Sequence, residues 1–241
     1  MKNVLITGGA GGIGQGITQK FIEQGYFAYV LDFDKMALDE VKNKFKDKCC
    51  CLCADVTDVI ALEQAISNLS THNGLNYVVT LAGRALENEW LPIEEQNYCD
   101  LEKSIKVNLL GHINTIKASL PLLKKASGDK GIVMISSINA KQSFGLPAYS
   151  AAKSGLYGFM NSTVKEFGNM GIRINTVSPG TIITEATKKE PKNFAELLKT
   201  SPLNKFATIK EVADVTFALC DTFTAITGED IVVDCGQSKL R

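Results

Sequence analysis

Tyr149 and Lys153 are the residues whose types and spacing best suit acid–base chemistry. They lie four positions apart in AYSAAKSGLYGFMNSTVKEFG, a segment with helical spacing, so both side chains should share one helix face. A tyrosine hydroxyl normally ionises at about pH 10, and a neighbouring ammonium lowers its pKa by favouring the phenolate. Such a tyrosine can exchange a proton with an alcohol oxygen near neutral pH. Taken alone, this spacing also arises by chance in ordinary helices.

A glycine-rich segment, TGGAGGIG at residues 7–14, follows the apolar run VLIT. Counted from Gly9 it fits G-x-G-x-x-G, and counted from Gly8 it fits T-G-x-x-x-G-I-G. Glycines allow a tight turn and close approach to a phosphate, which the free N–H groups at a helix start can bind. An ordinary structural turn is the alternative explanation.

The elements that must position these residues alternate along the chain. Apolar, β-branched runs, typical of strands buried on both faces, alternate with segments of helical spacing. The runs lie at residues 4–7, 27–32, 51–56, 77–83, 131–136, 172–179 and 230–235. They predict an α/β fold: a single domain over residues 1–241, with a doubly wound, Rossmann-type parallel sheet of about seven strands and helices on both faces. The irregular stretch 181–205 is a candidate substrate lid.

Composition excludes several classes of partner. The 26 basic residues balance 26 acidic ones, so the sequence predicts neither nucleic acid nor an anionic membrane as a partner. It has neither a transmembrane run nor a signal-peptide pattern, and a cytoplasmic location is expected. Four of the seven cysteines crowd into CCCLC at residues 49–53, where we expect a buried strand ending at Asp55 and no metal site. His72 and His112 both look unremarkable in the sequence, and neither is expected to take part in chemistry.

Several motifs together resemble the classical short-chain dehydrogenase/reductase family. They match in order and spacing over nearly the whole chain: TGGAGGIG, Asp55-Val56, Ala82-Gly83, Asn108 in KVNLLGH, GIVMISS, YSAAK, NTVSPGTIIT and ITGEDIVVDCG. The resemblance favours the register from Gly8. Two departures are TLAG, with Thr80 and Leu81 where the family usually has asparagines, and Cys235 where glycine is common. The first concerns local hydrogen bonding, and the second should affect packing more than chemistry.

The resemblance implies a role for each matching residue. Tyr149 would be the general acid/base, Lys153 would assist it and bind the nicotinamide ribose, and Asn108 would position a relay water. Ser137 matches the family by its place at the strand end and is our choice for holding the substrate oxygen, although Ser136 has the more usual distance from Tyr149. Cofactor contacts would come from Gly8, Gly12, Ile13, Gly14, Asp55, Val56, Ala82, Gly83, Asn108, Tyr149, Lys153, Pro179, Gly180, Ile182 and Thr184.

The expected activity is NAD(P)-dependent interconversion of a secondary alcohol and a ketone. Asp32, 24 residues after Gly8, should accept hydrogen bonds from the adenosine ribose and repel a 2′-phosphate, which predicts NAD rather than NADP. The alternative is that Asp32 is an ordinary strand-end acid that caps the next helix, although Asp34, just before KMALDEVKNKF, could fill that role instead. The alternatives are a reductase of carrier-bound 3-oxoacyl chains, weakly disfavoured by only three arginines, and a nucleotide-binding regulator without turnover.

No specificity motif identifies the substrate. Trp90, Phe144, Leu146 and Phe194 hint at an apolar pocket for a small alcohol or ketone. The resemblance also implies a homo-oligomer, a tetramer or a dimer, packed through the long helical segments 97–127 and 149–168.

Overall fold

The fold is built on one seven-stranded parallel sheet. A computed structural model describes residues 1–241 except 70, 72, 143–144, 186, 190–192 and 240–241. The strand order is β3-β2-β1-β4-β5-β6-β7, and every neighbouring pair is parallel. The strands are β1 (Asn3–Thr7), β2 (Phe27–Asp32), β3 (Cys49–Cys53), β4 (Tyr77–Thr80), β5 (Lys130–Ile135), β6 (Ile172–Pro179) and β7 (Asp230–Val233). This confirms the predicted doubly wound parallel sheet, and each strand overlaps one of the seven predicted runs.

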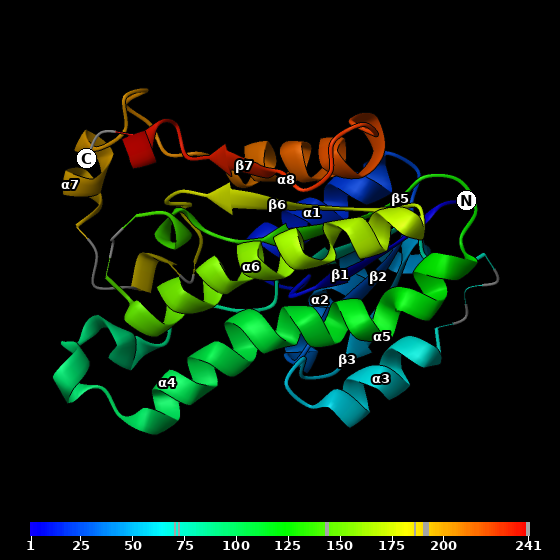
Figure 1. The fold of residues 1–241 in the computed structure, drawn as a ribbon, viewed down its shortest axis with the longest axis horizontal. Coiled ribbons are helices and arrows are strands. Elements are labelled where there is room, and N and C mark those ends of the chain that lie inside the picture. Colours follow the sequence, from blue (N-terminus) through cyan, green and yellow to red (C-terminus); the bar gives the residue numbers. More distant parts are fainter. Residues whose placement is uncertain (70, 72, 143–144, 186, 190–192, 240–241) are drawn as a thin grey trace.

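Helices cover both faces of this sheet (Figure 1). The α-helices are α1 (Gly12–Glu23), α2 (Lys35–Phe45), α3 (Val59–Ser67), α4 (Tyr98–Ile105), α5 (Gly111–Lys125), α6 (Pro147–Asn169), α7 (Phe194–Lys199) and α8 (Ile209–Phe217). Helices α3, α5 and α6 pack on one face, and α1, α2 and α8 pack on the other.

Short 3-10 and π turns link or extend these helices. They are η1 (Lys46–Lys48), η2 (Glu87–Trp90), η3 (Ile93–Glu95), η5 (Ile138–Ala140), η6 (Thr187–Lys189) and η8 (Gln237–Lys239), with π turns at η4 (Lys106–Leu110) and η7 (Ala218–Thr222). The predicted helical segment 97–127 therefore consists of α4, the π turn η4 and α5 in continuous succession (Figure 1).

The strands are apolar on both faces because each face carries its own core. In β1, Val4 and Ile6 pack with Phe21 of α1, whereas Leu5 between them packs in the second core with Leu156 of α6. Alternating side chains of one strand point to opposite faces, so a sheet buried on both sides requires apolar residues at successive positions.

The cysteine-rich strand differs from the prediction. Strand β3 spans Cys49–Cys53 rather than 51–56, and it is an edge strand that pairs only with β2. Side chains of this edge strand are covered unevenly: Cys49 is buried, Cys50 and Cys51 are partly buried and Cys53 is exposed, so the expected buried strand ending at Asp55 is wrong. Among the described residues, no cluster of three or more His, Cys, Asp or Glu side chains could hold a metal ion.

Strand order places the expected ligand crevice between β1 and β4. The chain runs outward from β1 through β2 to β3, and then returns to the other side of β1 with β4. Ligands of such sheets bind beyond the carboxyl ends of the strands where the order reverses. Across the described part of the chain, no helix combines the length and apolar character needed to cross a bilayer.

Candidate active site

A cleft of about 990 Å³ lies at the carboxyl ends of the central strands. Sixteen of the predicted site residues line it: Gly8, Gly12, Ile13, Gly14, Asp32, Asp55, Val56, Ala82, Gly83, Ser137, Tyr149, Lys153, Pro179, Gly180, Ile182 and Thr184. Ser136 lines it too, whereas Asn108 does not. The fold thus brings together residues spread over more than 170 positions of the sequence.

The glycine segment forms the turn from β1 into α1. Gly8 has a φ of +68°, and a Cβ there would lie 2.8 Å from the Ala82 nitrogen, so only glycine fits. A Cβ at Gly14 would overlap the carbonyl oxygen of Gly8, whereas a Cβ at Gly11 would meet nothing closer than 3.5 Å. A Cβ at Gly9 would lie 2.7 Å from the Val30 Cγ1, so packing requires glycine at Gly8, Gly9 and Gly14 more strictly than at Gly11. Helix α1 begins at Gly12, within the glycine segment.

Tyr149 and Lys153 share one face of α6 at the cleft. The Lys153 Nζ lies 5.7 Å from the centroid of the Tyr149 ring. Lys153 is only 2% exposed, and its ammonium donates to the Ile135 carbonyl oxygen at 2.9 Å. Burial lowers the pKa of Lys153 to about 7, because desolvation disfavours the charged form.

Two serines at the end of β5 have different surroundings. Ser136 Oγ donates to the backbone carbonyl of Lys153 at 3.1 Å, so this hydroxyl ties β5 to α6. Among the described residues, Ser137 Oγ has local contacts with Asn139, at 3.2 Å to its backbone nitrogen and 3.3 Å to its Oδ1. The Ser137 hydroxyl therefore contributes less than the Ser136 hydroxyl to contacts between distant elements.

Asn108 occupies the π turn η4, between α4 and α5, and is fully buried. Its amide nitrogen donates to the carbonyl oxygens of Arg84, at 3.0 Å, and Ser104, at 3.1 Å. Its Oδ1 has no hydrogen-bond partner among the described residues. A Cβ at Gly83 would collide with that oxygen, which explains why glycine follows Ala82. The structure thus places Asn108 behind the cleft wall rather than in it.

Asp32 ends β2 beside the glycine segment. Its two carboxylate oxygens accept from the backbone nitrogens of Ala10, at 3.1 Å, and Asp34, at 3.2 Å. Asp34 caps α2, since its Oδ1 accepts from the Ala37 nitrogen at 3.1 Å. The capping role considered for Asp32 is therefore filled by Asp34.

The expected apolar pocket is only partly present. Trp90 and Leu146 line the cleft, whereas Phe194 does not and packs against Phe206 with ring centroids 6.3 Å apart. Phe144 lies outside the described residues. The lid segment 181–205 contains η6 and α7, and contributes Thr181, Ile182, Thr184, Thr187 and Leu197 to the lining.

Two buried residues that act on the tyrosine–lysine pair were missed from the sequence. Glu89 of η2 is 1% exposed, and its Oε2 accepts from the Tyr149 backbone nitrogen at 2.9 Å. His112 of α5 lies 3.3 Å from the Lys153 Nζ through its Nε2, a contact that was not predicted. Two features of the sequence could have drawn attention to His112. It lies four residues after Asn108, and its partner Thr80 stands where the family usually has asparagine.

Glu89 caps the helix that carries the pair. Leu146 precedes α6 but makes no side-chain cap, so the first amides of the helix need another acceptor. A buried carboxylate also interacts favourably with the positive end of the helix dipole. Glu89 supplies both, from a segment 60 residues away in sequence.

We expect Glu89→Gln to lower the free energy of unfolding by about 1–2 kcal/mol, because it removes the charge from this cap. Urea titration followed by circular dichroism measures the change. Glu87→Gln, at an exposed position of the same turn, is the matched control and should be nearly neutral. Equal stability of both variants would show that Glu89 does not support α6.

Comparisons with known proteins point to one family. The family described as "Enoyl-(Acyl carrier protein) reductase" matches residues 8–238. An uncharacterized oxidoreductase of Schizosaccharomyces pombe is 32% identical over 241 residues, covering 97% of this chain and 89% of that protein. The 3-oxoacyl-[acyl-carrier-protein] reductase FabG of Chlamydia muridarum is 32% identical over 247 residues, covering 98% of this chain and 97% of that protein.

Solved structures show the same likeness. A short-chain dehydrogenase/reductase from Burkholderia thailandensis superposes with a TM-score of 0.87 at 31% identity, covering 98% of this chain and 92% of that one. A 3-oxoacyl-[acyl-carrier protein] reductase from Brucella melitensis with bound NAD gives 0.89 at 30% identity, covering 98% and 90%. This chain belongs to the short-chain dehydrogenase/reductase family and is an oxidoreductase of that family.

Proposed function

We propose that the protein interconverts a secondary alcohol and a ketone with a nicotinamide dinucleotide as cofactor, NAD rather than NADP. The observation that carries the proposal is the placement of Tyr149 and Lys153 on one helix face, in the same cleft as the glycine turn at Gly8. An acid–base pair beside a phosphate-binding turn suits a reaction in which a proton and a hydride leave the same carbinol.

The cleft fits such a cofactor. Its volume of about 990 Å³ is near the upper end of the range for small-molecule sites. The Gly8–Gly14 turn brings backbone N–H groups to the start of α1, where a pyrophosphate would be held. Asp32 and Asp55 lie on the adenosine side, and Gly180, Ile182 and Thr184 on the nicotinamide side. When bound, the nicotinamide supplies the hydride chemistry.

The residues of this chain provide orientation and proton transfer. In alcohol oxidation, the Tyr149 oxygen accepts the hydroxyl proton of the substrate, and in ketone reduction it returns a proton to the carbonyl oxygen. The positive charge of Lys153 stabilises the phenolate form of Tyr149. We assign Ser137 to hold the substrate oxygen through its hydroxyl, and Trp90 and Leu146 to the wall against the substrate carbons.

The relatives favour one second candidate. Several of them, including the Chlamydia muridarum protein, are named 3-oxoacyl-[acyl-carrier-protein] reductases. Reduction of a 3-oxoacyl thioester is the same chemistry on a ketone that carries a long acyl chain. The cations Arg84 and Lys103 line the cleft, although both are exposed.

A screen of secondary alcohols, ketones and a 3-oxoacyl thioester with NAD(H) and NADP(H), followed by nicotinamide absorbance, tests the proposal. We expect turnover of at least one simple alcohol or ketone, with NAD preferred. Turnover of the thioester alone would establish the second candidate. Cofactor binding without turnover of any compound would favour a nucleotide-binding regulator.

We also propose that the protein is a homo-oligomer, most simply a tetramer. Tyr98 of α4 is 89% exposed and Leu110 at the start of α5 is 42% exposed, so these helices present apolar side chains outward. Multi-angle light scattering should give about four times the chain mass of 26.1 kDa, or twice it for a dimer. A monomer mass at micromolar concentration would contradict the proposal.

A further inference from the structure

A buried chain of hydrogen bonds runs behind Lys153. The Oγ1 of Thr80, in β4, lies 2.7 Å from His112 Nδ1, and the His112 Nε2 lies 3.3 Å from Lys153 Nζ. Thr80, His112 and Lys153 are 0%, 1% and 2% exposed, and they come from β4, α5 and α6. A buried polar chain of this kind fixes the side chains that form it.

The chemistry of the donors assigns the ring proton. An ammonium group only donates, so His112 Nε2 must accept from Lys153 while the lysine is charged. The ring proton of His112 then resides on Nδ1 and is donated to the Thr80 hydroxyl oxygen. Thr80 therefore selects the tautomer that can accept from Lys153.

The Lys153 ammonium has two fixed acceptors on the protein. Its N–H groups donate to the Ile135 carbonyl and to His112 Nε2. Lys153 also lines the cleft, together with Tyr149.

His112 remains neutral in this arrangement. Burial lowers the pKa of His112 well below its usual value, and the charge of Lys153 lowers it further. Among the described residues, Lys153 is the charged group that acts on His112 in this way. Tyr149 is the other titratable group beside Lys153, with its ring centroid 5.7 Å from Nζ.

We propose that His112 is a positioning residue that holds the Lys153 ammonium, with Thr80 fixing its Nδ1–H tautomer. The consequence for catalysis rests on the proposed function, whereas the hydrogen-bond chain does not. Thr80 stands where the family usually has asparagine, and its hydroxyl pairs with the His112 ring.

Histidine ring nitrogens can be observed directly. The chain has only two histidines, so ¹⁵N-labelled histidine gives two signal sets, and His72→Gln identifies those of His112. At about pH 6 we expect a neutral His112 ring, protonated at Nδ1 and unprotonated at Nε2. An imidazolium, or a proton on Nε2, would overturn the proposal. This measurement needs neither cofactor nor substrate, so it stands even if the proposed activity is absent.

Two variants distinguish a hydrogen-bonding role of His112 from a packing role. His112→Gln retains an acceptor for Lys153, whereas His112→Leu retains volume but has no acceptor. Without that acceptor, the charged form of Lys153 loses a hydrogen bond, and the pKa of Lys153 falls by about one further unit. Affinity for NADH, measured by fluorescence titration, should then decline at a pH about one unit lower in the leucine variant. The glutamine variant should follow the unmutated protein.

Coincident pH profiles for the leucine variant and the unmutated protein would overturn the positioning role, because a structural defect alone lowers affinity without moving its pH dependence. If the unmutated protein binds no nicotinamide dinucleotide at any pH, the proposed function fails while the tautomer measurement still decides the role of His112.

Discussion

Tyr149→Phe is expected to lower kcat by about 10² or more while leaving cofactor affinity nearly unchanged. The substitution removes only the hydroxyl that exchanges a proton with the substrate. Lys153, the glycine turn and Asp32 are untouched, so the other residues assigned to the cofactor remain. Steady-state kinetics with the best substrate of the screen, and fluorescence titration with NADH, measure the two quantities separately.

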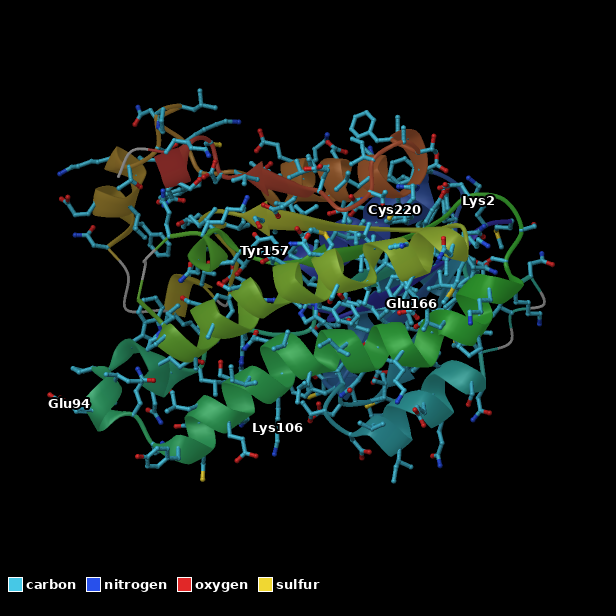
Figure 2. The ribbon with its side chains drawn as sticks, viewed as in Figure 1. Lys2, Glu94, Lys106, Tyr157, Glu166 and Cys220 are labelled. Atoms are coloured by element: carbon cyan, nitrogen blue, oxygen red, sulfur yellow. The ribbon has the colours of Figure 1, made fainter. Side chains whose placement is uncertain are left out.

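Tyr157→Phe is the matched control for that experiment. Tyr157 lies two turns further along α6 (Figure 2), and its hydroxyl pairs with Ser178 Oγ of β6 at 2.6 Å. Loss of this bond should reduce stability by about 1 kcal/mol but leave kcat within a few-fold. If Tyr149→Phe retained more than half of the activity, or if both variants lost activity equally, Tyr149 would not be the general acid/base.

The parts of the fold that could be predicted are those with a local cause. Because the sheet is buried on both faces, successive residues of each strand are apolar. These apolar runs allowed seven strands to be predicted from the sequence. Tyr149 and Lys153 could be paired because α-helical spacing alone places them on one face. The requirement for glycine at Gly8 and Gly14 is also local, because it comes from the tight turn from β1 into α1.

The parts that could not be predicted depend on contacts between distant segments. Glu89 reaches Tyr149 across 60 residues, and no local pattern marks a carboxylate that caps a helix elsewhere in the chain. His112 meets Lys153 only because α5 and α6 pack on the same face of the sheet. The burial of the β3 cysteines was misjudged for a related reason, because strand order, not composition, makes β3 an edge.

The cofactor preference depends on Asp32, and we expect kcat/KM to favour NAD over NADP by at least about tenfold, or about 1.4 kcal/mol. The Asp32 carboxylate is fixed beside the glycine segment by its bonds to the nitrogens of Ala10 and Asp34, and it lines the cleft. A carboxylate there accepts from the ribose hydroxyls and repels the 2′-phosphate of NADP. Lys35, the cation nearest in sequence, is exposed and does not line the cleft.

Asp32→Ser should therefore erode the preference, mainly by improving kcat/KM for NADP, because the repulsion is removed while a hydroxyl remains to meet the ribose. Asp34→Ser is the comparison, since it removes a neighbouring carboxylate whose bond to the Ala37 nitrogen caps α2. We expect that variant to lose stability and to keep most of its preference for NAD. If Asp34→Ser changed the ratio and Asp32→Ser did not, the discriminating carboxylate would be Asp34. Equal or better use of NADP by the unmutated protein would mean that neither carboxylate excludes the 2′-phosphate.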